Sequence, residues 1–214
     1  MAPPALRWVL SHVKPEAQEL ERLKREELTA ESTIARIHRV LLPVRQRPTT
    51  EGVETSALEA RLLERLGAEN AISLTLLNVS RAGERDAGLD FLEEVKPRFT
   101  TPELVVKAVE SDDAATAILD EAQKDYELLV LGATEASTRR DDAIFHPIID
   151  RLVRLAPCPT LVVRGGVEQV GWRSGPILVP TNGTIASRQA AEFAFRIAGD
   201  DDLVVILNVI READ

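Results

Sequence analysis

The residues of this chain best suited to chemistry stand together in a polar segment, residues 132–142. The segment reads Gly-Ala-Thr-Glu-Ala-Ser-Thr-Arg-Arg-Asp-Asp and follows a short apolar run. Its hydroxyl and cationic side chains are Thr134, Ser137, Thr138, Arg139 and Arg140. Hydroxyls, backbone amides and guanidinium groups ahead of a helix are donors that bind phosphate. The segment therefore predicts a site for a phosphate-bearing ligand.

Other residues join this site only if the fold brings further strand ends to the same edge. In an open parallel sheet, ligands bind beyond the carboxyl ends of the strands, where the strand order reverses. Apolar runs in this chain end near residues 44, 79 and 132. The further ligand-binding residues that we predict at these ends are Pro43, Val44, Arg45, Val79, Gly132, Ala133 and His146.

The sequence predicts neither catalysis nor a metal site. The three histidines, His12, His38 and His146, are too scattered along the chain to indicate metal binding. Cys158 has no activating base nearby and is expected to be a small buried residue where a strand begins. No nucleophile, base and orienting group can be assembled, so we expect a protein that is not an enzyme. A nucleotide hydrolase is the least favoured alternative.

The elements that position these residues alternate regularly between strand and helix. Apolar runs predict strands at 39–44, 71–79, 103–109, 127–132 and 159–164, and periodic patterns predict helices at 53–67, 87–97, 112–125 and 143–156. Nearly continuous apolar strands separated by helices are typical of a parallel sheet covered on both faces. The fold class is therefore α/β, doubly wound with five parallel strands. Gly67 is predicted as a left-handed helix cap, and Ser111-Asp112 as an N-cap.

Part of this pattern occurs twice. Residues 40–79 and 177–209 share a strand ending in Val-Pro or Pro-Val, a helical stretch and a second strand ending in Leu-Asn-Val. The prolines Pro43 and Pro180 lie 137 positions apart, and the Leu-Asn-Val triplets lie 130 apart. We predict a connector at 1–37, a complete domain at 38–165, a linker at 166–175 and the incomplete start of a second domain at 176–214. The strand tip of the second copy offers Pro180, Thr181, Asn182 and Gly183.

The chain resembles the universal stress protein (Usp) family. The resemblance rests on the strand-Pro-helix order from Val40 to Gly67, the loop that opens at Gly132, and the run Leu-Ala-Pro-Cys-Pro-Thr-Leu-Val-Val at 155–163. Residues 176–191 look like the start of a second Usp domain. The resemblance implies a sheet in the order 3-2-1-4-5, dimerisation and, in one branch of the family, binding of ATP or AMP.

The residues depart from the nucleotide-binding branch at four of its five positions. That branch is marked by a loop motif: Gly, then any two residues, Gly, any nine residues, and finally Gly followed by Ser or Thr. The motif uses glycines because the loop backbone must approach the phosphate closely. Here Gly132 is present, but the later positions fall on Glu135, Phe145 and His146. The acidic residue that follows the first strand in the family falls on Arg45. We therefore expect ATP or AMP to bind weakly if it binds.

Composition narrows the partners and the setting. Acidic residues outnumber basic ones by 35 to 26, for a formal net charge of −9. A negatively charged chain repels the phosphate backbone, so we do not expect nucleic acid as a ligand. A single cysteine excludes an internal disulfide and fits a reducing, cytoplasmic setting. No apolar stretch approaches the length of a membrane span.

The N-terminal residues 1–37 suggest a larger native polypeptide. Trp8 to Pro15, followed by a highly charged helical stretch, resembles the juxtamembrane connector of cation/proton antiporters that carry Usp tails. The leading hypothesis is thus a cytoplasmic regulatory Usp-like module of such an antiporter, with an upstream membrane transport domain, sensing an adenine nucleotide or forming a homodimer. The alternative is a ligand-free dimerisation or scaffold domain of a stress-response protein.

Overall fold

The fold comes from a computed structural model that describes residues 36–45, 51–68, 71–133, 146–164, 176–199 and 202–208. The side chains of residues 51–57 and 185 lie outside that description. The chain divides into two compact units, Ile37–Trp172 and a second unit made of Met1–Arg36 with Arg173–Asp214. Each unit is described by itself.

The first unit is a parallel sheet of five strands. These are β1 (Arg39–Pro43), β2 (Ser73–Ser80), β3 (Glu103–Glu110), β4 (Leu128–Ala133) and β5 (Thr160–Arg164). The strand order is β3-β2-β1-β4-β5, with every neighbouring pair parallel. This is the predicted sheet, so the fold class is confirmed. The strand order reverses between β1 and β4, because the chain builds outward first on one side of β1 and then on the other.

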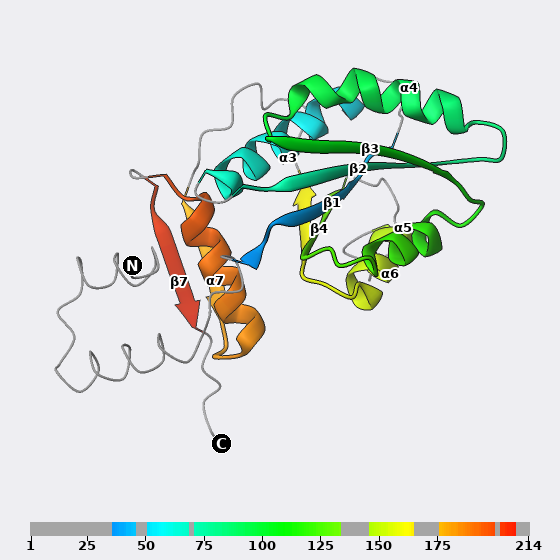
Figure 1. The fold of residues 1–214 in the computed structure, drawn as a ribbon. Helices are drawn as coiled ribbons and strands as arrows, with labels where there is room; N and C mark the ends of the chain where they lie inside the picture. Colours follow the sequence, from blue (N-terminus) through cyan, green and yellow to red (C-terminus); the bar gives the residue numbers. More distant parts are fainter. Residues whose placement is uncertain are drawn as a thin grey trace, which may run out of the picture. The chain divides into compact units, whose positions relative to one another are not determined.

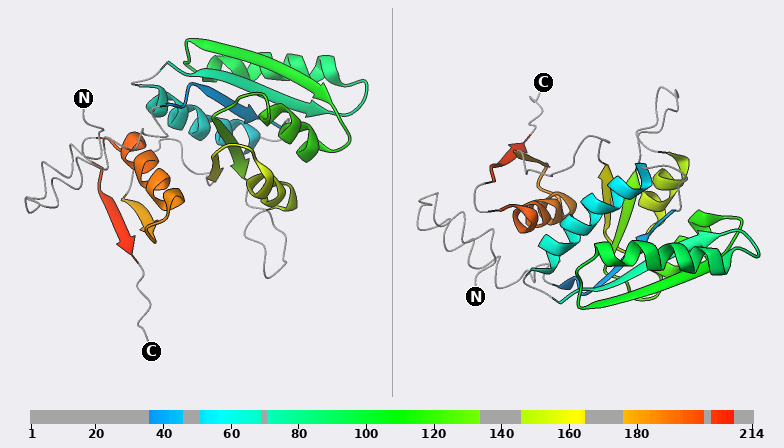
Figure 2. Two further views of the ribbon diagram at one scale, coloured as in Figure 1. Left: turned by 60° about the horizontal axis from the view of Figure 1, so that its bottom comes forward. Right: turned by 90° about the horizontal axis from the view of Figure 1, so that it is seen from above.

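Helices cover both faces of this sheet. Figure 1 shows α3 (Glu51–Gly67) and α4 (Arg85–Val95) on one face, and α5 (Ala114–Ala122) and α6 (Pro147–Leu155) on the other. A short 3-10 turn, η2 (Lys96–Arg98), follows α4. The two further views in Figure 2 show the same layering. Each helix connects two parallel strands, which is the reason a parallel sheet is buried on both faces.

The core consists of the apolar runs that predicted the strands. Alternate residues of one strand point to opposite faces, so Val40 and Leu42 belong to one layer and Leu41 to the other. All three are fully buried. On the α5 and α6 side, Leu41 and Leu77 form one cluster with residues that include Ile118 of α5, Leu152 of α6 and the strand residues Leu129 and Leu131. Burial of these aliphatic side chains is the main stabilising contribution.

Two predictions about helix ends are wrong. Gly67 is the last residue of α3, but only Gly83 and Gly183 have positive φ among the described glycines, so Gly67 is not a left-handed cap. The N-cap of α5 is Asp113 rather than Ser111-Asp112, because the Asp113 side chain accepts the Thr116 N–H. The helix also ends earlier than predicted, at Ala122, where a turn with Asp125 at φ 60° leads towards β4.

The second unit contains a smaller β-α-β element. Strand β6 (Ile177–Thr181) pairs in parallel with β7 (Val204–Asn208), and α7 (Ile185–Ile197) connects them (Figure 1). The predicted strand-helix-strand order of residues 176–209 is therefore observed. The predicted domain boundaries themselves stay a prediction, because residues 1–35 of the predicted connector 1–37 and the whole predicted linker 166–175 lie outside the described residues.

Candidate functional site

The carboxyl edge of the first sheet brings the ends of β1, β2 and β4 together. Pro43 ends β1 opposite Leu77, and the Val44 N–H donates to the Leu77 carbonyl at 2.8 Å, which carries the pairing one residue past the strand. Arg45 follows directly and is exposed. Because all strands are parallel, Gly132 and Ala133 at the end of β4 face the same edge. The structure thus places Pro43, Val44, Arg45, Gly132 and Ala133 at one rim.

Val79, also a predicted site residue, lies farther along. Strand β2 continues beyond the end of β1, and its residues Asn78, Val79 and Ser80 pair with β3 instead. Val79 is half-buried there and packs against the core cluster of the α5 and α6 side. It therefore borders the rim next to β1, with its side chain partly used for packing.

Asn78 is a rim residue that was not among the site residues predicted from the sequence. Its amide Nδ2 donates to the Val44 carbonyl at 3.1 Å, and the residue is only 4% exposed. A buried amide that ties the chain after β1 to β2 fixes the direction in which Arg45 leaves the sheet. The sequence feature that could have indicated Asn78 is its position in the Leu-Asn-Val triplet, which occurs in both copies of the repeat.

Four helices of this unit begin at the carboxyl edge. The side chains at the start of α3 lie outside the described residues, and two of the other three helix starts are already served by carboxylates. The Glu110 side chain accepts the Gly83 N–H at 2.9 Å and the Arg85 N–H at 3.3 Å at the start of α4. The Asp113 carboxylate occupies the start of α5. A helix N-terminus that holds its own carboxylate is a poor site for a second anion, because the two negative charges repel each other.

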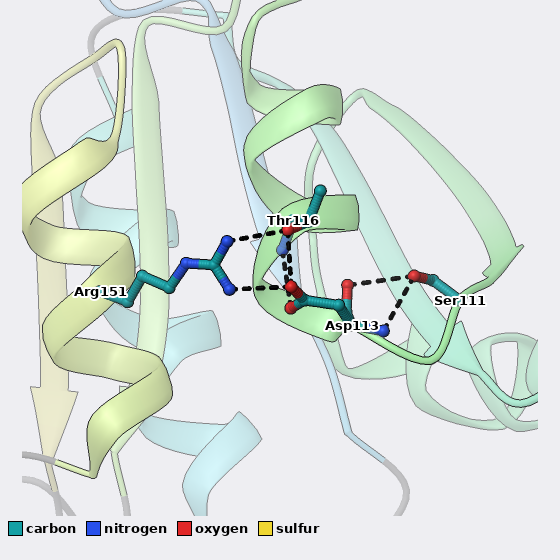
Figure 3. Close-up of polar contacts among 4 residues, drawn as sticks. All are labelled: Ser111, Asp113, Thr116 and Arg151. Carbon is teal, nitrogen blue, oxygen red and sulfur yellow. Dashed lines mark hydrogen bonds and ion pairs between the residues drawn. The ribbon is translucent and has the colours of Figure 1, made fainter.

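The start of α5 is a four-residue polar cluster (Figure 3). Asp113 accepts the Thr116 N–H at 3.1 Å and the Thr116 hydroxyl at 2.7 Å, and Arg151 of α6 donates to it at 2.8 Å. A second Arg151 nitrogen reaches the Thr116 hydroxyl at 2.9 Å, and Ser111 closes the turn. Hydrogen bonds from Thr116, and then from Arg151, hold the pKa of the Asp113 carboxyl far below its ordinary value.

The start of α6 is different, because its cap is an imidazole rather than a carboxylate. The His146 ring nitrogen Nδ1 accepts the Ile148 N–H at 3.3 Å, with Pro147 as the first helical residue. His146 is exposed. The one acid in the first turn, Asp150, is paired with Arg154 at 2.9 Å. Of the three helix starts in this unit whose side chains are described, those of α4, α5 and α6, only that of α6 lacks a carboxylate acceptor. Helix α6 follows β4 at the strand-order reversal.

The rest of the predicted site cannot be placed. Thr134, Ser137, Thr138, Arg139 and Arg140 lie outside the described residues, as do Glu135 and Phe145. What the structure brings together is therefore the frame of the predicted site, formed by the ends of β1 and β4 and the start of α6.

The strand tip of the second unit is closed by its own hydrogen bonds. The Asn182 side-chain oxygen accepts the Thr184 N–H at 3.2 Å and the Thr184 hydroxyl at 2.7 Å. Thr184 caps α7 by accepting the Ser187 N–H, and the Thr181 hydroxyl lies 3.1 Å from that of Ser187. Gly183 adopts a φ of 79°, which suits glycine. Pro180 is exposed. These groups form a turn whose polar side chains are already engaged with one another.

Two further features concern metal binding and membrane insertion. Within the part of the chain that the structure describes, no group of three or more His, Cys, Asp or Glu side chains is placed to hold a metal ion. No helix among those same residues is long and apolar enough to cross a membrane.

Comparison with protein families decides the lineage. Residues 9–164 match the model of the "Universal stress protein family". The chain belongs to the universal stress protein family. Membership agrees with the Usp sheet order 3-2-1-4-5 and with the resemblance that residues 38–165 carry. No curated protein matches this Usp chain.

Solved structures share the Usp fold at low sequence identity. A functionally unknown protein from Pseudomonas aeruginosa PAO1 is 19% identical, with a TM-score of 0.59 over 82% of this chain and 62% of that one. Universal stress protein UspA from Lactobacillus plantarum is 20% identical, with a TM-score of 0.46 over 61% of this chain and 99% of its own. A universal stress protein in complex with cAMP is 16% identical over 61% of this chain and 99% of its own, with a TM-score of 0.45.

Proposed function

We propose that this Usp chain is a regulatory module that binds a phosphate-bearing ligand, an adenine nucleotide, weakly at the rim between β1 and β4, without catalysis of its own. The observation that carries the proposal is the start of α6. It lies at the strand-order reversal, and its cap is the His146 imidazole rather than a carboxylate. An anion is favoured at such a helix start by the helix dipole and by unpaired N–H groups.

Further residues at the rim support an anionic rather than a neutral ligand. Arg45 follows β1 and is exposed, so it can reach a phosphate without loss of an existing buried contact. In the sequence, Arg139 and Arg140 belong to the segment that joins β4 to α6. Glu135 in that segment opposes phosphate binding, which is why the proposed affinity is low.

Calorimetric titration of the whole chain with ATP, ADP and AMP tests the ligand. We expect dissociation constants weaker than about 1 μM, equivalent to about −8 kcal/mol. Arg45→Ala should weaken binding further, whereas Arg188→Ala, an exposed arginine of α7 paired with Glu192, is the matched control and should not. If a nucleotide binds and its dissociation constant is the same in Arg45→Ala as in the wild type, the assignment of the site to the rim is contradicted. Release of inorganic phosphate from ATP would contradict the absence of catalysis.

The second candidate function is a dimerisation or scaffold domain that binds no ligand. It is favoured by one specific feature, the two carboxylates that already occupy the starts of α4 and α5. Homodimerisation is part of both candidates. A chain that gives no heat with any nucleotide but sediments as a dimer would favour this second function.

The wider setting belongs to the same proposal. We place this module on the cytoplasmic side of a membrane, within a cation/proton antiporter whose transport domain precedes it. The support is the resemblance of residues 1–37 to antiporter connectors, together with the single cysteine. An antibody against this chain tests it on fractionated native cells. We expect a membrane-bound band much larger than 23.5 kDa, and a soluble band of that mass would contradict the setting.

A further inference from the structure

The Arg151 guanidinium lies at the same end of the first unit as the proposed ligand site. Helix α6 begins at Pro147, and Arg151 follows one turn later, about 6 Å along the helix axis. Side chains of a helix lean towards its N-terminus, so Arg151 points back to the start of α6. Its partner agrees with this direction, because Asp113 is the N-cap of α5 and stands three residues after the end of β3. The guanidinium is therefore a cation at the carboxyl edge of the sheet.

The contacts that hold Arg151 are exposed to solvent. Its Nη1 donates to the Asp113 Oδ2 at 2.8 Å and its Nη2 to the Thr116 hydroxyl at 2.9 Å (Figure 3). The Arg151 side chain is 45% exposed and the Asp113 side chain 51%. Solvent screens such a pair, so its separation costs little free energy. The acid in the first turn of α6, Asp150, is paired with Arg154 instead.

A polyphosphate is a better partner for Arg151 than a single carboxylate is. A guanidinium forms bidentate hydrogen bonds with phosphate, and each further phosphate group adds negative charge to the attraction. The helix α5 does not lose its cap when Arg151 changes partner, because Asp113 still accepts the N–H and the hydroxyl of Thr116. The exchange therefore breaks only contacts that are weak in water.

We propose, on the basis of the function proposed above, that Arg151 gives the rim its preference for ligands with several phosphate groups, by exchanging Asp113 for the outer phosphates. A single phosphate held at the start of α6 leaves Arg151 with Asp113. A chain of two or three phosphates extends from that position towards Arg151. The ion pair with Asp113 opposes the exchange and lowers the affinity for these longer ligands.

Calorimetric titration of the whole chain with AMP and ATP, in buffer without Mg²⁺, tests the proposal. Arg151→Gln should weaken ATP binding about 3-fold or more and leave AMP binding unchanged, because only the longer ligand reaches the guanidinium. Asp113→Asn should strengthen ATP binding by a similar factor, because asparagine keeps the α5 cap and releases Arg151. Arg154→Gln is the matched control, since Arg154 is an ion-paired arginine in the last turn of the same helix. It should change neither affinity.

The opposite signs of these two effects separate ligand binding from a purely structural role. Both substitutions break the same ion pair, so a role confined to joining α5 with α6 would change ATP binding in the same direction. The double variant Asp113→Asn/Arg151→Gln separates the release of Arg151 from the loss of charge repulsion by Asp113. The gain from Asp113→Asn should vanish in it. A gain that persists in the double variant overturns the proposal.

Arg45→Ala distinguishes a failure of the role of Arg151 from a failure of the rim site itself. ATP binding that Arg45→Ala weakens but Arg151→Gln leaves unchanged overturns the role of Arg151 and keeps the rim site. Equal weakening of AMP and ATP by Arg151→Gln overturns the preference for several phosphates. No heat with either nucleotide overturns both the rim site and the role of Arg151.

Discussion

At the scale of single residues, the rim depends on close contacts between side chains that are distant in sequence. Asn78 is tied to the Val44 carbonyl and packs directly against α4. A Cβ atom placed on Gly88 would lie 2.6 Å from the Asn78 Oδ1 and 3.5 Å from the Ala108 Cβ. Gly88 has an ordinary helical backbone conformation, which any residue can adopt. Glycine is required there because α4 approaches β2 too closely to leave room for a side chain.

Gly88→Ala should destabilise the protein by about 1–3 kcal/mol, because the added methyl group overpacks a buried contact. Helix propensity alone would stabilise the variant by about 1 kcal/mol, so the sign of the change is diagnostic. Urea unfolding followed by circular dichroism measures it. In an Asn78→Ala background the same substitution should cost much less. A stabilised Gly88→Ala single variant would show that Asn78 moves aside freely.

Glu121 is a buried carboxylate in the last turn of α5. It accepts bonds from Lys107 at 2.6 Å, Lys124 at 2.9 Å and the Tyr126 hydroxyl at 3.1 Å. Burial raises the pKa of Glu121, but the hydrogen bonds from Lys107 and Lys124 outweigh it, so the net pKa lies below the ordinary value. The carboxylate therefore stabilises the fold above the pKa of the unfolded state, and this stability is lost as the pH falls through the folded-state pKa.

Glu121→Gln should lower the free energy of unfolding by about 1–3 kcal/mol at about pH 7, because charged hydrogen bonds are weakened at a buried site. A second measurement at acid pH, below the lowered folded-state pKa of Glu121, should show a smaller difference from the wild type, because the wild-type carboxylate is protonated there too. Asp120→Asn, at the exposed neighbouring position, is the control. An equal difference at both pH values would mean that charge plays no part.

At the scale of elements, α5 and α6 are joined by Arg151 and Asp113 (Figure 3). The cluster is exposed, so solvent screens the ion pair and its contribution is small. The cap on the Thr116 N–H is a separate contribution, because it satisfies a helix-terminal donor. The two roles of Asp113 can be separated by substitution.

We expect Asp113→Ala to lower the unfolding temperature more than Arg151→Ala, because only the first change removes the cap. Asp112→Ala, one residue earlier, should have little effect, since the structure assigns the cap to Asp113. Differential scanning calorimetry ranks the three variants. Equal losses for Asp112→Ala and Asp113→Ala would return the cap to the position predicted from sequence.

At the scale of the whole molecule, the two units differ in how completely their strands are covered. The first unit has five strands between two helical layers, whereas β6 and β7 form a two-stranded sheet in which Val205, Ile206 and Leu207 of β7 are all exposed. Two-stranded sheets are marginal on their own. Amides of β6 and β7 in dilute solution should therefore exchange faster than those of β1 and β2, as mass spectrometry of peptic fragments would reveal. Uniform protection would show that the second unit has the stability of the first.

The order of elements, the parallel sheet and the edge that carries the candidate site can all be predicted from the amino-acid pattern. Periodicity and apolar runs report burial directly, and a parallel sheet brings its carboxyl ends together whatever its side chains are. By the same logic, the sequence predicts that Arg45 and Gly132 lie at one rim. The repeated pattern separately aligns Leu41 with Leu178.

Which side chains these residues contact depends instead on how the elements pack in three dimensions. Asp113 and Arg151 are 38 positions apart, and Asn78 meets Gly88 through helix packing rather than through the strand pattern. Contacts of this kind depend on distances between side chains of different elements, which local propensity does not encode. For the same reason, Leu41 and Leu178 share a pattern but differ in burial: Leu41 packs in a cluster with residues of α5 and α6, whereas Leu178 is exposed within the described part of the second unit.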